Sequence, residues 1–156
     1  MKLRTVAIII ALIIIADQAL KIWIKTSYPL GHVSNVLGSK FQLYFVENPG
    51  MAWGWKFGNE TGKVILTLFR LAAVIFGTWY LARIVKQRHH RGFIVCAALI
   101  YAGALGNLID SMFYGMMFDK GMHFDQVTKT FIQNYNGIAA LNFQGYSSFL
   151  HGSVVD

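Results

Sequence analysis

The amino-acid sequence predicts an all-α polytopic membrane protein that carries a small β-cradle outside the membrane. Of its 156 residues, 55% are hydrophobic and only 13% are charged, whereas a soluble domain has roughly a quarter charged residues. Three apolar runs are each about 20 residues long, the length that a helix needs to span a bilayer. We expect a single integral membrane domain over residues 1–156.

The three apolar runs predict membrane spans over residues 5–24, 63–84 and 93–112. The first span follows Lys2 and Arg4, and a cleaved signal peptide would begin in the same way. No small-x-small cleavage site follows promptly, however, and the polar residues Asp17 and Lys21 continue the helical segment. We therefore expect this span to be retained.

Basic residues predict how the spans are oriented. The short segment between the second and third spans contains Arg83, Lys86, Arg88 and Arg91. Loops rich in Lys and Arg stay in the cytoplasm, which also places the basic N-terminus inside. Because the basic residues lie beside apolar runs, the net charge of +7 does not indicate a nucleic-acid partner.

Two segments remain outside the membrane in this topology. Residues 28–58 are expected to form the β-cradle, because residues 41–46 are β-prone and are followed by the turn signal "ENPG". Aromatic side chains in this segment suit the membrane interface. Residues 113–150 are polar and mixed in composition, and we expect them to form a structured cap or a long loop.

The polar residues of the three spans are predicted to gather toward the outer face. Asp17 lies about 18 Å into the first span at about 1.5 Å per residue, and Lys21 follows one helical turn later. Asn107 and Asp110 lie near the outer end of the third span, and Arg70 lies near that of the second. Such residues are costly in hydrocarbon and need partners or a function.

Simpler structural roles remain open for each of these residues. Asp17 and Lys21 could form only an i,i+4 ion pair. Arg70 could be a structural counter-ion for Asp17 or Asp110, and Asn107 could form an interhelical hydrogen bond. The histidines lack metal-ligand spacing, so we predict no metal and no cofactor. The single cysteine, Cys96, lies in an apolar run and is expected to pack there.

Carboxylates at the outer interface are the chemistry that remains. Two carboxylates that share a proton can hydrolyse a peptide bond, because one activates water while the other donates a proton to the carbonyl oxygen. The last residues, "GSVVD", place Asp156 on the same side of the membrane as Asp110.

Four motifs carry a resemblance to a known family. "ADQALK" (16–21), "VENPGMAWG" (46–54), "GALGNLID" (103–110) and "HGSVVD" (151–156) resemble, in order, the motifs of the lipoprotein signal peptidase (signal peptidase II) family. The resemblance implies four membrane helices and an outer β-cradle. It also implies an aspartic endopeptidase of the bacterial cytoplasmic (inner) membrane, with its active site near the outer face.

The same resemblance implies a substrate and roles for individual residues. The substrate would be a diacylglyceryl-modified bacterial prolipoprotein, cleaved before its lipidated cysteine by a monomer surrounded by membrane lipid. Asp156 matches one member of the catalytic aspartate pair. Supporting roles fall to Asp17, Lys21, Asn107 and Asp110, and substrate contacts to Asn48 and Gly50.

Several positions depart from the family pattern. Ser111 stands where an arginine is common, so the missing charge would have to come from elsewhere, with Arg70 as a candidate. Met51 and Trp53 replace residues that are often Ala and Phe, and residues 113–150 form an insertion. The final Asn-x-Ala-Asp motif does not appear, so the sequence is a fragment or the second catalytic aspartate has been lost. We expect residues 1–156 alone to be inactive.

A rival interpretation is a small transporter or channel subunit that uses Asp17, Lys21 and Arg70 as an ion relay. A relay predicts polar residues through the whole depth of the membrane. The inner halves of the first and third spans, residues 6–15 and 93–99, contain no charged residue. This distribution favours chemistry near the outer surface.

Overall fold

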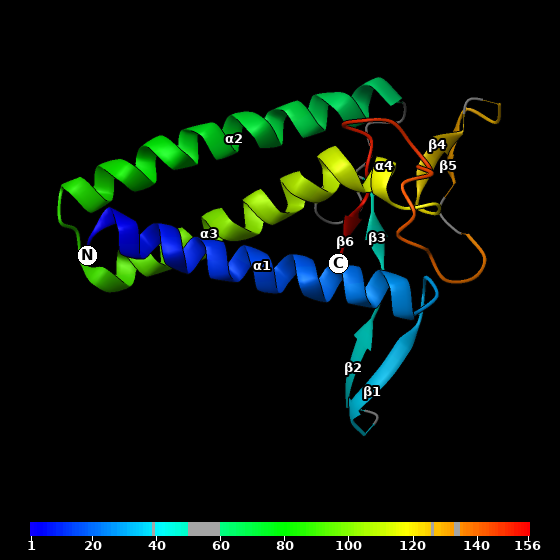
Figure 1. The fold of residues 1–156 in the computed structure, drawn as a ribbon, viewed down its shortest axis with the longest axis horizontal. Helices are drawn as coiled ribbons and strands as arrows, with labels where there is room; N and C mark the ends of the chain where they lie inside the picture. Colours follow the sequence, from blue (N-terminus) through cyan, green and yellow to red (C-terminus); the bar gives the residue numbers. More distant parts are fainter. Residues whose placement is uncertain (39, 50–59, 126, 133–134) are drawn as a thin grey trace.

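Three long helices form the body of the protein, and small strands gather at one end of them (Figure 1). The computed structural model describes residues 1–38, 40–49, 60–125, 127–132 and 135–156. The long helices are α1 (Leu3–Ser27), α2 (Glu60–Lys86) and α3 (Arg91–Ile109). Within the described residues, three helical stretches are long and apolar enough to cross a membrane, which confirms the predicted polytopic architecture.

The third span does not end where the apolar run was predicted to end. The helical chain continues beyond α3 as the π-helix η2 (Asp110–Tyr114) and the short α4 (Gly115–Met117). The first residues of the segment 113–150 are therefore helical. Single π-helical turns are rare and often occur at functional sites, and this one begins at Asp110.

The strands form three separate two-stranded antiparallel sheets. In the cradle region β1 (Val33–Leu37) pairs with β2 (Phe41–Tyr44). The short β3 (Glu47–Asn48) pairs with β6 (Val154–Val155), and β4 (His123–Asp125) pairs with β5 (Thr130–Ile132). The small sheet region that the sequence predicted is thus present, although residues 50–58 of the predicted cradle lie outside the described residues.

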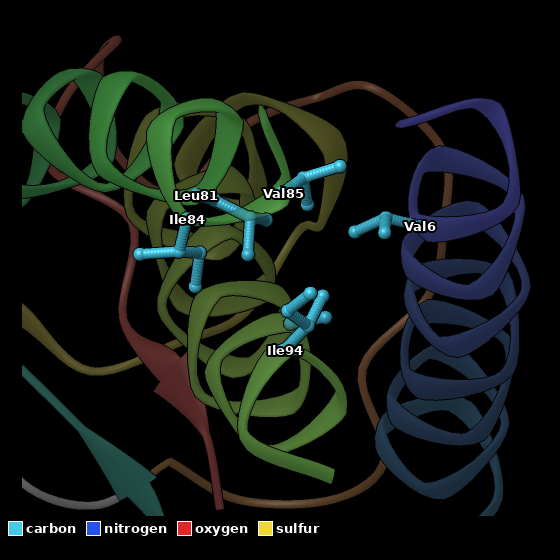
Figure 2. Packing of buried hydrophobic residues seen from close by; sticks show 6 residues of the cluster. Val6, Leu81, Ile84, Val85 and Ile94 are labelled. Atoms are coloured by element: carbon cyan, nitrogen blue, oxygen red, sulfur yellow. The ribbon is translucent and has the colours of Figure 1, made fainter. Parts of the chain in front are cut away.

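Helix α3 is the centre of the bundle, because it packs along both α1 and α2 while these two helices meet only slightly. A buried apolar cluster joins all three helices at the end that holds the N-terminus (Figure 2). Its members are Val6, Leu81, Ile84, Val85, Ile94 and Ala98. A membrane offers little hydrophobic driving force between helices, so close packing of this kind holds them together.

A second buried cluster lies at the opposite end. It consists of Phe45, Tyr114, Phe118, Ala139 and Val155. These residues come from the cradle, the end of the third helical stretch, the segment 113–150 and β6. The segment 113–150 therefore packs onto the end of the bundle opposite the N-terminus and contacts the strand that leads to Asp156.

The basic α2–α3 turn and the N-terminus lie at one end of the bundle, and the strands lie at the other (Figure 1). The positive-inside rule expects both basic segments on the cytoplasmic side, and this arrangement lets them lie on the same side of the membrane.

We expect Arg88→Cys to resist a membrane-impermeant thiol reagent added to intact cells, and Lys40→Cys and Lys129→Cys to react with it. The native Cys96 is replaced by Ala in every variant. Labelling of position 88 from outside would show that the orientation is wrong.

Candidate functional site

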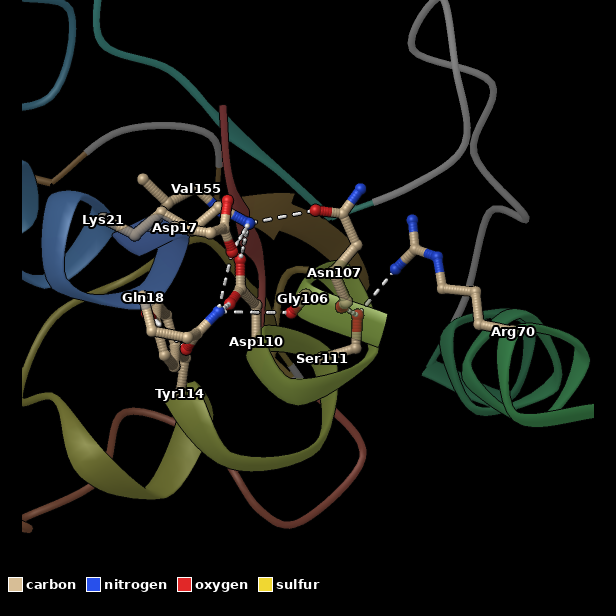
Figure 3. Close-up of polar contacts among 10 residues, drawn as sticks. All are labelled: Asp17, Gln18, Lys21, Arg70, Gly106, Asn107, Asp110, Ser111, Tyr114 and Val155. Carbon is tan, nitrogen blue, oxygen red and sulfur yellow. Dashed lines mark hydrogen bonds and ion pairs between the residues drawn. The ribbon is translucent and has the colours of Figure 1, made fainter. Parts of the chain in front are cut away.

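The carboxylate of Asp110 lies at the centre of a polar cluster between α1 and α3 (Figure 3). Its side chain is fully buried. The Gln18 amide donates to Oδ1 at 2.9 Å, and the Lys21 ammonium donates to Oδ2 at 2.8 Å. The backbone N–H of Val155 also donates to Oδ2, at 3.3 Å. Three elements distant in sequence, α1, η2 and β6, therefore meet at this one carboxylate.

The Lys21 ammonium connects three other residues that the sequence predicted for the site. Besides Asp110, its ammonium contacts Asn107 Oδ1 at 3.0 Å and Asp17 Oδ2 at 3.3 Å. The i,i+4 ion pair expected on the first span is thus present, but it is part of a larger network. Two carboxylates share one ammonium, and only the Asp17 side chain is notably accessible, at 32%.

Gln18 and Tyr114 belong to the cluster but were missed in the sequence. Gln18 Nε2 lies 3.1 Å from Asp17 Oδ2 and 3.4 Å from the carbonyl oxygen of Gly106, and the Tyr114 hydroxyl donates to Gln18 Oε1 at 3.1 Å. Residues three and four apart share a helix face. Gln18 precedes Lys21 by three positions, so helical spacing could have identified it.

Gly106 allows the two helices to approach at this point. A Cβ built on Gly106 would lie only 2.5 Å from Asp17 Oδ2. Small residues at helix interfaces in membranes let backbones come close in this way. Because Gly106 of α3 has no side chain, the Asp17 carboxylate of α1 can lie close to the backbone of α3.

Arg70 reaches the site from α2. Its Nη1 donates to Ser111 Oγ at 2.6 Å, and that hydroxyl donates to the carbonyl oxygen of Asn107 at 2.9 Å (Figure 3). The guanidinium also interacts electrostatically with the carboxylates of Asp156 and Asp110. Arg70 thus brings a cation from a different helix into contact with Ser111, the position where an arginine is common in the family pattern.

Asp156 follows β6 and is held through its backbone. Its N–H donates to the Val46 carbonyl oxygen at 3.0 Å, and its own carbonyl oxygen accepts from the Val46 N–H at 3.2 Å. Asp156 is exposed and lines a groove of about 310 Å³ between α1 and the β1–β2 hairpin. Most of the groove is lined by apolar and aromatic side chains, among them Leu20, Trp23, Tyr28, Leu43 and Phe45.

The remaining predicted site residues have mixed outcomes. Asn48 lies in β3, opposite Val154 in β6. Gly50 lies outside the described residues. No three His, Cys, Asp or Glu side chains of the described part of the chain gather as metal ligands, and the absence of a metal or cofactor stays a prediction.

Removal of the shared cation should destabilise the protein. The variant Lys21→Met leaves buried Asp110 facing Asp17 without an ammonium between them. Breaking a buried ion pair costs about 3–5 kcal/mol, so thermal unfolding in detergent should begin at a clearly lower temperature than for the wild type. Unchanged unfolding would show that the network contributes little to folding.

Two glycines of α3 provide a matched test of the helix contact. Gly106→Ala should lower the unfolding temperature, since overpacking of this kind costs about 1–3 kcal/mol. Gly103→Ala is the control, because a Cβ there meets nothing within 4 Å and alanine favours a helix. Equal behaviour of the two variants would contradict the close approach of Asp17 to α3.

Comparison with known proteins identifies sequences similar to this chain. The sequence profile of the signal peptidase (SPase) II family matches residues 9–122. The lipoprotein signal peptidase of Porphyromonas gingivalis is 42% identical over 154 residues, which cover 98% of this chain and 62% of the relative. Those of Amoebophilus asiaticus and Chromobacterium violaceum are 36% and 34% identical over 67% and 70% of this chain, and 45% and 66% of the relatives.

No solved structure gives a significant match. The chain spans about 62% of the length of the Porphyromonas gingivalis relative. The match therefore shows the family of the chain, and the activity of the whole protein is a separate question. The profile covers most of the chain and includes Asp17, Lys21, Asn107 and Asp110. The chain therefore belongs to the signal peptidase (SPase) II family.

Proposed function

We propose that this protein is an intramembrane aspartic endopeptidase that removes signal peptides from diacylglyceryl-modified bacterial prolipoproteins, cleaving before the lipidated cysteine. One observation carries the proposal beyond family membership. Buried Asp110 binds the amide of Val155 at 3.3 Å, and the next residue, Asp156, lines an apolar groove. A carboxylate held at the wall of an apolar groove suits cleavage of a lipid-bearing peptide.

In the proposed chemistry Asp156 is one of two carboxylates that share a proton, and the other would come from an Asn-x-Ala-Asp motif that residues 1–156 do not contain. The ionised member removes a proton from water while the protonated member donates to the scissile carbonyl oxygen. Asp110 acts on this pair indirectly, since it holds the strand that leads to Asp156. Asp17, Lys21 and Asn107 support Asp110 in turn, because all three join the same hydrogen-bonded network.

The groove suggests how the substrate is recognised. Its apolar and aromatic lining suits the acyl chains or the apolar part of a signal peptide. Asn48 and Gly50 are proposed to contact the substrate backbone, and Arg70 to balance the negative charge around Asp156. We propose a monomer in the bacterial cytoplasmic membrane, with its N-terminus in the cytoplasm and its site near the outer face.

An ion relay across the membrane has less support. The polar cluster lies toward the end that carries the strands, whereas apolar residues such as Val6, Ile84 and Ile94 fill the core at the other end. A continuous path of polar groups would be needed there. The peptidase is therefore the better interpretation of the geometry.

Cleavage of a lipidated precursor tests the proposal. The protein expressed from its complete gene is purified in detergent, and the mobility of a diacylglyceryl-modified prolipoprotein is followed on a gel. Asp156→Asn should abolish cleavage. Asn107→Ala and Asp110→Asn should slow it by roughly 10- to 100-fold, the usual effect of losing a residue that orients a reactive group.

The same precursor without the diacylglyceryl group is the control and should not be cleaved. No cleavage by the wild type would refute the proposed function. Wild-type rates for Asn107→Ala and Asp110→Asn would leave these residues with a packing role only. Activity in Asp156→Asn would mean that the catalytic pair is a different one.

A further inference from the structure

A second buried ion pair lies beyond the candidate site and is not used by the proposed chemistry. Lys25 is fully buried at the end of α1, and its ammonium is paired with the Glu47 carboxylate of β3. Neither residue was selected from the sequence. Burial of two charges is costly unless their remaining hydrogen-bonding capacity is also satisfied, so the surroundings of this pair indicate what it does.

The partners of Glu47 come from the outer segment 113–150. The Tyr135 hydroxyl donates to Glu47 Oε1 at 2.6 Å, and the backbone N–H of Met122 donates to Oε2 at 2.9 Å. Lys25, Glu47, Tyr135 and the Met122 amide are called the outer clamp below. The clamp ties α1, β3 and the outer segment together at one carboxylate.

Aromatic rings enclose the cation of the clamp. The Lys25 ammonium lies 5.0 Å from the ring centre of Phe118 and 5.4 Å from those of Tyr135 and Tyr146. Cation–π contacts of this kind are strongest where water is excluded. Burial, and then the charge of Glu47, raise the pKa of Tyr135 above its ordinary value.

The clamp is coupled to Asp156 through β3. Glu47 stands opposite Val155 in the β3–β6 pair, and the residue before it, Val46, exchanges two backbone hydrogen bonds with Asp156. The carboxylate that fixes β3 therefore also fixes the strand that carries Asp156. On the other side, Val155 is held by Asp110.

The outer segment supports β6 a second time. The Ser153 N–H donates to the Tyr146 hydroxyl at 2.8 Å, and the Ser153 hydroxyl donates to the Met122 carbonyl oxygen at 2.7 Å. Met122 thus contacts Glu47 through its N–H and Ser153 through its carbonyl. Met122 therefore links Glu47 of β3 to Ser153, the residue directly before β6.

We propose that Glu47 is a positioning residue: through the outer clamp it uses the segment 113–150 to set where Asp156 stands relative to Asp110 and the groove. This inference rests on the proposed function for its catalytic meaning, while the positional claim concerns β6 alone. It also gives the insertion a role in the site.

The variant Glu47→Gln tests the proposal, because it keeps the shape of the side chain and removes its charge. We expect the kcat for the lipidated precursor to fall by roughly 10- to 100-fold with KM little changed. Amide hydrogen exchange of residues 153–156 should become at least about 10-fold faster, while exchange in α2 and α3 stays at the wild-type rate. Asp125→Asn makes the same acid-to-amide change at the end of β4, away from the clamp, and should alter neither quantity.

Tyr135→Phe provides a milder variant in case Glu47→Gln does not fold. It removes one hydrogen bond to Glu47 and keeps the ring over Lys25, so we expect the same two changes at a smaller size, about 3-fold. The proposal would be overturned if residues 153–156 of the folded variants exchanged their amide hydrogens at the wild-type rate. It would also be overturned if kcat fell only in proportion to the fraction of folded protein.

The two measurements separate this inference from the proposed function. If the wild-type protein does not cleave the precursor, the proposed function fails, and hydrogen exchange alone still decides whether the clamp holds β6. If the wild type cleaves but Glu47→Gln cleaves equally fast, the function stands and the positioning role of Glu47 is wrong.

Discussion

The burial of one carboxylate is the constraint on which the arrangement of this protein depends. Asp110 is fully shielded from solvent, and a charge in such surroundings persists only with close, well-aligned partners. The partners come from α1, as Gln18 and Lys21, and from β6, as the Val155 amide. The need to satisfy Asp110 therefore determines how the first helix, the third helix and the last strand meet.

Shape complements charge at this point. Gly106 leaves room for the Asp17 carboxylate, and Gly152 performs a similar task near the end of the chain, where a Cβ would collide with the carbonyl oxygen of Asp110. Hydrogen bonds hold the polar groups only if the backbones come this close. The π-helical turn at Asp110–Tyr114 begins at the same carboxylate. Close backbone packing, an irregular helical turn and a buried charge therefore occur within the same few residues.

Two ionic networks follow each other along one face of α1. Lys21 contacts Asp110, and Lys25, one helical turn closer to the C-terminal end of α1, pairs with Glu47. Both networks reach β6, the first through Val155 and the second through β3. A strand of two residues has few contacts of its own, and this double attachment explains how Asp156 can be held beside the groove.

The sequence by itself determined the membrane architecture and four members of the central cluster, Asp17, Lys21, Asn107 and Asp110, but not Gln18 or Tyr114. Length and apolarity of a span are local properties, and the i,i+4 spacing of Asp17 and Lys21 follows from helical geometry alone. Only the tertiary structure decided that Arg70 meets Ser111 and that Glu47 pairs with Lys25. These contacts join residues far apart in the chain, and no periodicity encodes them, because they depend on how α1, α2 and the outer segment pack around α3.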